Sequence, residues 1–129
     1  MSLFVSSEPS DYFKAMIVAT ILNAQPEKAL ALLSRHFHVE EPKIGVGVFK
    51  GRSKGIRAAY SGKRKEILAA KRDYLYDPFT ILHEFYHHLR YFDNEHRGTE
   101  KLADKFALDF IEAYNKILRK VEQLEGISK

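Results

Sequence analysis

The chain has 129 residues, a formal net charge of +4 at pH 7 and no cysteine. This length predicts one domain with a buried core and is too short for two. The lack of cysteine excludes disulfides, thiolate metal sites and cysteine nucleophiles, and it favours a cytoplasmic location. The longest apolar-rich run, residues 15–22, is far too short to cross a bilayer, and the first residues lack a signal-peptide pattern, so we expect no membrane insertion.

Capping signals and hydrophobic periodicity predict, in chain order, two helices, three short strands and two more helices. The expected helices cover residues 10–24, 26–37, 78–92 and 100–124. The expected strands cover residues 43–49, 55–60 and 65–71. Ser61 and Gly62 are typical of a hairpin turn between the last two strands. The prediction is therefore a small antiparallel sheet in a compact α+β fold.

The third predicted helix carries His83-Glu84-Phe85-Tyr86-His87, an HExxH motif, and Asp77-Pro78 is a typical start for it. In a helix the two imidazoles lie one turn apart on one face, where both can bind one Zn²⁺. Glu84 then stands beside the open coordination position as a general base. The motif predicts metal-assisted hydrolysis; the alternative is two ordinary histidines on a solvated helix face.

A catalytic zinc site needs a third protein ligand, and the segment after the motif offers Glu100. Thr99 is a typical N-cap, and the loop before it is short enough to fold the last helix back antiparallel onto the motif helix. Ala103 and Ala107, on nearly the same face as Glu100, allow the two helices to approach closely. Asp104, one turn beyond Glu100, is placed to accept a hydrogen bond from the outer N–H of a zinc-bound imidazole.

Other residues near the motif compete for the third position. Asp93 follows the motif by six residues, as in layouts whose third ligand closes a tight turn, but such a turn needs glycine where Arg90 stands. Asp93 therefore ranks well below the glutamate of the next helix. His96 is a further candidate ligand. His88 points about 100° away from its neighbour in the motif, so we expect it to support a ligand from behind or to be exposed.

With HExxH followed by Glu100 and, four residues later, by Asp104, the sequence resembles the gluzincin metallopeptidases, and among them most of all the small archaeal minigluzincins. Residues 100–107 are also similar to the E-x-x-A-[ND]-x-x-A segment of the phage-repressor-cleaving metallopeptidases. The specific likeness covers about residues 77–107. It implies that His83, His87 and Glu100 bind zinc and that Glu84 is the base, the same four residues that the spacing indicates.

The sequence thus predicts a zinc-dependent endopeptidase, in which Glu84 takes a proton from the metal-bound water and passes it to the leaving amine. Tyr91, His96 and Arg97 are the candidate donors to the oxyanion, and their positions do not choose among them. The resemblance also suggests that the encoded chain is a latent precursor. Residues 125–129, with Gly126 as the helix C-cap, form a short polar tail that could reach back over the cleft.

Basic residues concentrate in the strand region, at Lys50, Arg52, Lys54, Arg57, Lys63, Arg64, Lys65, Lys71 and Arg72. The preferred interpretation is a solvated sheet face whose charged edges suppress aggregation. In an enzyme, the sheet edge beside the cleft would bind an extended polypeptide substrate by strand addition. Two alternatives stay open: a basic nucleic-acid-binding module with an accidental motif, and a zinc-binding interaction domain without catalysis.

Overall fold

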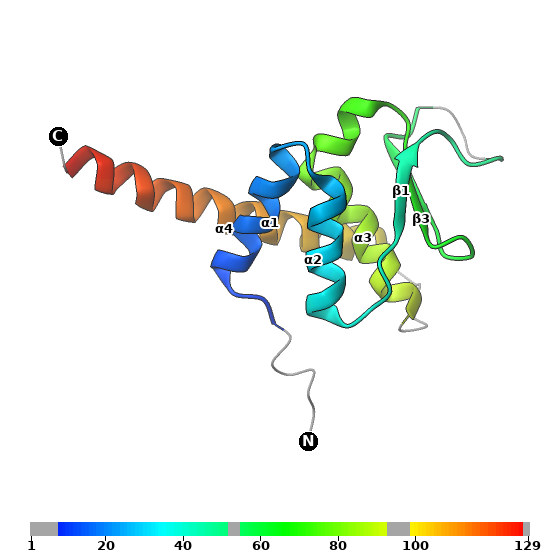
Figure 1. Cartoon of the computed structure of the whole chain (residues 1–129), viewed down its shortest axis with the longest axis horizontal. Coiled ribbons are helices and arrows are strands. Elements are labelled where there is room, and N and C mark those ends of the chain that lie inside the picture. The colour runs from blue at the N-terminus through cyan, green and yellow to red at the C-terminus, as the bar shows by residue number, and fades with distance from the viewer. Residues whose placement is uncertain (1–7, 52–54, 93–98, 128–129) are drawn as a thin grey trace, which may run out of the picture.

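The computed structural model describes residues 8–51, 55–92 and 99–127. Within these ranges the chain forms four α-helices, a three-stranded sheet and a short 3₁₀ helix, which confirms the predicted α+β class (Figure 1). No helix in these ranges is both long and apolar enough to cross a membrane. In chain order the elements are α1 (Asp11–Leu22), α2 (Pro26–Phe37), β1 (Lys43–Val46), β2 (Ala58–Ser61), β3 (Glu66–Ala69), η2 (Arg72–Tyr76), α3 (Pro78–Phe92) and α4 (Thr99–Ile127).

Local capping residues fix helix starts close to their predicted positions. Ser10 Oγ accepts a hydrogen bond from the backbone N–H of Phe13 at 3.1 Å, which caps α1. Asp77 caps α3 in the same way, because its carboxylate accepts the backbone N–H of Thr80 at 3.2 Å. α3 therefore begins at Pro78, as predicted, so the whole HExxH motif lies within the helix, whose period puts His83 and His87 on one face.

The sheet is mixed, so the prediction of an antiparallel sheet is wrong for β1. β2 and β3 form the expected antiparallel hairpin, with Tyr60 opposite Ile67. β1 instead pairs with β3 in parallel, with Ile44 opposite Ile67, and the strand order is β1-β3-β2. The period of a strand does not determine which strand it pairs with, and the segment between β1 and β2 is long enough to pass β3. As a result, β2 is an edge strand.

α3 packs against α4 on one side and β2 on another. Its Ile81, Leu82 and Phe85 side chains are fully buried in a core shared with α1 and α2. α4 contributes Ala103 and Ala107, both fully buried. These small side chains allow close approach of the helices, as predicted, and bring the start of α4 to the polar face of α3.

α4 is longer than predicted, because it continues through Gly126 to Ile127. Gly126 is therefore not a C-cap. One glycine inside a helix costs only about 1 kcal/mol, and α4 continues through it. The C-terminal half of α4 projects past α1, away from the sheet (Figure 1). At about 1.5 Å per residue, Ile127 lies roughly 40 Å along the helix from Glu100. Residues 125–127 therefore continue the helix and do not fold back over the cleft, and the last two residues of the predicted tail lie outside the described residues.

Candidate metal centre

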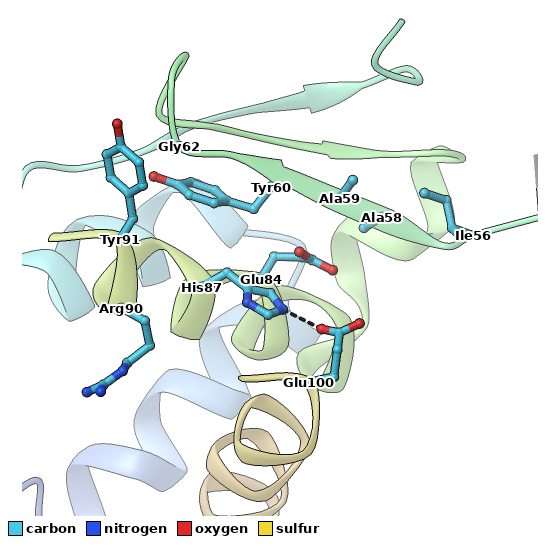
Figure 2. Close-up of a pocket in the computed structure, with 10 residues that line it drawn as sticks. All are labelled: Ile56, Ala58, Ala59, Tyr60, Gly62, Glu84, His87, Arg90, Tyr91 and Glu100. Atoms are coloured by element: carbon cyan, nitrogen blue, oxygen red, sulfur yellow. Dashed lines mark hydrogen bonds and ion pairs between the residues drawn. The ribbon is translucent and has the colours of Figure 1, made fainter. Parts of the chain in front are cut away.

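Three side chains of the predicted site meet where the start of α4 crosses the polar face of α3. His83 and His87 stand one turn apart on α3, with their Nε2 atoms 3.3 Å apart. Glu100, in the first turn of α4, places its Oε1 atom 3.1 Å from Nε2 of His83 and 2.6 Å from Nε2 of His87. The ligand atoms of all three residues lie within 4.8 Å of one another. Figure 2 shows the Glu100 carboxylate directed at the His87 ring.

The donor set fits a tetrahedral metal ion. Two nitrogen ligands at about 2.0–2.1 Å from one tetrahedral ion lie about 3.3 Å apart, which matches the 3.3 Å between the two Nε2 atoms. Oε1 of Glu100 is at hydrogen-bond distance from Nε2 of His87, 2.6 Å, and would have to move away from that ring to share the ion. Two imidazole nitrogens and one carboxylate oxygen, with a fourth position open, form one of the usual catalytic zinc sets. The same donors also bind other divalent metals, so the geometry gives a candidate metal site and does not identify the metal.

Asp104 lies directly behind one of the two imidazoles. Its Oδ1 atom is 2.9 Å from Nδ1 of His83. Because a carboxylate can only accept a hydrogen bond, Nδ1 donates to Asp104. In a neutral ring this leaves the lone pair on Nε2, the atom that a metal ion would use, whereas a hydrogen bond from Nε2 to Glu100 in the metal-free arrangement needs a proton on that atom. That atom faces Glu100 and His87. Asp104 thus sets both the tautomer and the orientation of the His83 ring in the way that metal binding needs.

Glu100 is 81% exposed at its side chain, yet two imidazoles hold its carboxylate. Burial acts to raise the pKa of this carboxyl, but hydrogen bonds and charge interactions with His87 and His83 outweigh it. The pKa of Glu100 therefore lies below its ordinary value. At neutral pH the residue is a carboxylate, which is the form that binds metal.

Glu84 lies beside this cluster at the base of a cleft. The residue is only 7% exposed, and Figure 2 shows its carboxylate directed from α3 toward β2. The cleft has a volume of about 400 Å³ and also receives His87, Arg90 and Tyr91 from α3 and Ala58, Ala59 and Tyr60 from β2. A second hollow of about 250 Å³ extends to His83 and shares Ala58, Glu84 and Glu100 with the first. Together they form a groove that follows β2 past the metal-site residues.

Tyr91 is the one candidate oxyanion donor within the described residues. Its ring packs against the β2–β3 turn so closely that a Cβ atom on Gly62 would lie 2.3 Å from it. Figure 2 shows its hydroxyl directed away from the metal-site residues, so in this arrangement Tyr91 does not serve the site as a donor. Three other predicted candidates lie outside the described residues: His96, Arg97 and the rival ligand Asp93.

His88 is neither exposed nor behind a ligand, which corrects the prediction for it. The residue is 0% exposed, and its ring nitrogens bond the carbonyl of Glu40 at 2.6 Å and the hydroxyl of Tyr60 at 2.5 Å. Because a carbonyl only accepts, Nε2 donates to Glu40 and Nδ1 accepts from Tyr60. Burial lowers the pKa of His88, which keeps the ring neutral. The spacing of four and three residues from Ile81 through Phe85 to His88 was the signal for this burial.

Comparisons of the chain with protein-family models, with curated proteins and with solved structures give no match. The interpretation of the site therefore depends on its own geometry. That geometry consists of three residues that could hold a metal ion, a partly enclosed glutamate next to them, and a groove along an edge strand.

Proposed function

We propose that this protein is a zinc-dependent endopeptidase of the gluzincin type. The observation that carries the proposal is the convergence of His83, His87 and Glu100, with Asp104 behind His83. An accidental HExxH pentapeptide would not need a carboxylate from a second helix to complete the donor set, nor another to orient one of its rings. Glu84, which lines the cleft beside the set, then has the position of a general base.

Each residue of the site has a distinct part in this proposal. A zinc ion bound there supplies a Lewis acid and lowers the pKa of a water molecule. Glu84 moves the proton: its carboxylate accepts one from the attacking water and donates it to the leaving amine. Enclosure between α3 and β2 limits the access of bulk water to that carboxylate. Asp104 holds the His83 ring in the tautomer that the cluster requires.

β2 supports a polypeptide as the substrate. This strand pairs with β3 on one side, and its residues Ala58, Ala59 and Tyr60 line the cleft. An extended peptide can add to such an edge through main-chain hydrogen bonds. Ala58 and Ala59 carry only methyl side chains, so this part of the strand adds little bulk to the cleft that Glu84 also lines.

Metal analysis and proteolysis together test this function. The zinc-loaded chain should hold one zinc ion and digest unfolded casein, and a chelator should abolish the digestion. Glu84→Gln should keep the zinc and lose the digestion. Glu112→Gln, the same change on the exposed face of α4, should keep both. A chain without affinity for zinc would refute the proposal.

The same experiment separates three related outcomes. Digestion that appears only after limited proteolysis of the zinc-loaded chain would identify the encoded protein as a latent precursor. Stoichiometric zinc without digestion of any unfolded protein, before or after limited proteolysis, would support an interaction domain without catalysis. In that case Glu84→Gln should change neither zinc affinity nor any measured activity.

A further inference from the structure

A separate basic hollow adjoins the proposed active-site cleft at the β2–β3 turn. Its volume is about 440 Å³, and we call it the turn subsite, defined by Phe49, Lys50, Tyr60, Gly62, Lys63 and Arg64. Tyr60 and Gly62 also line the main cleft, so the two spaces are continuous. Figure 2 shows the chain running along β2 from Ala58, near Glu84 and Glu100, to the turn at Gly62 beside Tyr91. The turn subsite therefore lies at one end of the groove, away from the metal-site residues.

The turn subsite is cationic. Lys50, Lys63 and Arg64 are all exposed, and no acidic side chain lines the hollow among the described residues. Arg64 has a long contact of 3.7 Å to Glu66, which at an exposed position contributes little. The next cation along the chain differs from these three, because Lys65 forms an ion pair with Glu40 at 2.9 Å. The positive charge at the turn is thus available to a ligand.

The turn that carries these cations is held in place. The Ser61 hydroxyl accepts the backbone N–H of Arg64 at 3.2 Å, which closes the turn. Tyr60, at the base of the hollow, is bonded to the fully buried His88 of α3. Gly62 lies against the Tyr91 ring at a distance that leaves no room for a side chain. A fixed turn lets its cations act at one place along a bound peptide rather than along its whole length.

We propose that the turn subsite binds a carboxylate side chain of the substrate, so that the preferred substrates are acidic polypeptides. The inference rests on the proposed peptidase function, because it uses the strand-addition mode of binding. From Ala58 to Gly62 the strand advances about 13 Å at about 3.3 Å per residue. The acidic residue therefore falls roughly two to four residues from the scissile bond, on one side of it only.

A nucleic acid fits this groove less well than an acidic peptide does. A phosphate chain that followed β2 from the turn subsite would pass the carboxylates of Glu84 and Glu100. The aromatic residues of the hollow are also unsuited to base stacking, since Phe49 is largely buried and the Tyr60 hydroxyl is engaged by His88. A single carboxylate at the turn, followed by an ordinary peptide, meets neither obstacle.

Cleavage-site profiling on a peptide mixture of known sequences tests the subsite. The wild-type enzyme should favour Asp or Glu at one position two to four residues from the cleaved bond. Lys63→Glu combined with Arg64→Glu should lower kcat/KM for an acidic peptide relative to its Gln analogue by roughly two- to tenfold, and should favour Lys at the same position. Lys71→Glu with Arg72→Glu, the same charge change at the far end of β3, should alter neither preference.

A binding measurement separates failure of the subsite from failure of the peptidase function. Zinc-loaded Glu84→Gln should bind a fluorescent acidic peptide more tightly than its Gln analogue, and added salt should reduce the difference. Binding of this kind without cleavage by the wild type would support the subsite and count against the peptidase. Cleavage without any acidic preference, or an equal effect of both charge-reversal pairs, would overturn the subsite alone. Tighter binding of a single-stranded oligonucleotide than of the acidic peptide would overturn it in favour of a nucleic-acid site.

Discussion

Glu100→Ala should weaken zinc binding by more than about 100-fold. Removal of a group that only supports a ligand typically costs about 10- to 100-fold in affinity. Glu100 supplies one of the three converging ligand atoms itself, so its loss should exceed that range. In free energy, a 100-fold loss corresponds to about 2.7 kcal/mol. A variant whose zinc affinity falls by 100-fold would therefore lose that much of the stabilisation that saturating zinc gives to the folded protein.

The same substitution should leave the metal-free fold intact. The Glu100 side chain is 81% exposed, and it packs against no part of the core. Its contacts with His83 and His87 are exposed pairs, which contribute at most about 1 kcal/mol. For a domain of this size such a loss lowers the melting temperature by roughly 2–8 °C. Any larger effect seen with zinc present is therefore an effect on metal binding.

Zinc titration against a competing chelator dye, with thermal melts in the presence and absence of zinc, measures both quantities. Glu112→Ala, on the exposed face of α4, is the matched control and should bind zinc as the wild type does. Zinc affinity unchanged by Glu100→Ala would refute the three-ligand assignment. If Asp93→Ala or His96→Ala removed the zinc instead, the third ligand would belong to residues 93–98 and the gluzincin type would be wrong.

Three further substitutions test the surroundings of the site. Asp104→Asn should weaken zinc binding by about 10- to 100-fold in the same titration, less than loss of the third ligand does. Ala107→Leu should overpack the contact between α3 and α4 and cost about 1–3 kcal/mol in denaturant melts, whereas Leu108→Ala, at an exposed position, should cost much less. Tyr60→Phe should cost about 1–3 kcal/mol in the same melts, because it removes the hydroxyl that His88 bonds; an unchanged midpoint would contradict that role.

The convergence of His83, His87 and Glu100 could be predicted from the sequence because local rules determine most of its geometry. The helix period places His83 and His87 on one face, and the cap at Asp77 starts that helix at Pro78, before the motif. The single long-range step, the return of α4, was signalled by the small residues Ala103 and Ala107. Both are fully buried in the contact, so the helices can approach as the pattern required.

His88 and the end of α4 show where local patterns are insufficient. The burial of His88 depends on β2 and Glu40, which come from distant parts of the chain and supply its two hydrogen-bond partners. A polar residue beside the motif was therefore expected to support a ligand or to be exposed, although its spacing from Phe85 was that of a core position. At Gly126 the helix propensity of a single residue was overridden by the turns around it.

Strand order was also beyond local patterns, and it decides how the groove can work. A sheet built in chain order would have placed β2 between β1 and β3, with both sides of its backbone already paired. In the observed order β3 is central, and β2 lies at the edge beside α3. A peptide can then pair with β2, pass Glu84, and reach the cations of the turn at Lys63 and Arg64. With β2 in the centre, a peptide could not pair with it, so the strand-addition mode that both proposals use depends on the feature of the fold that the sequence did not reveal.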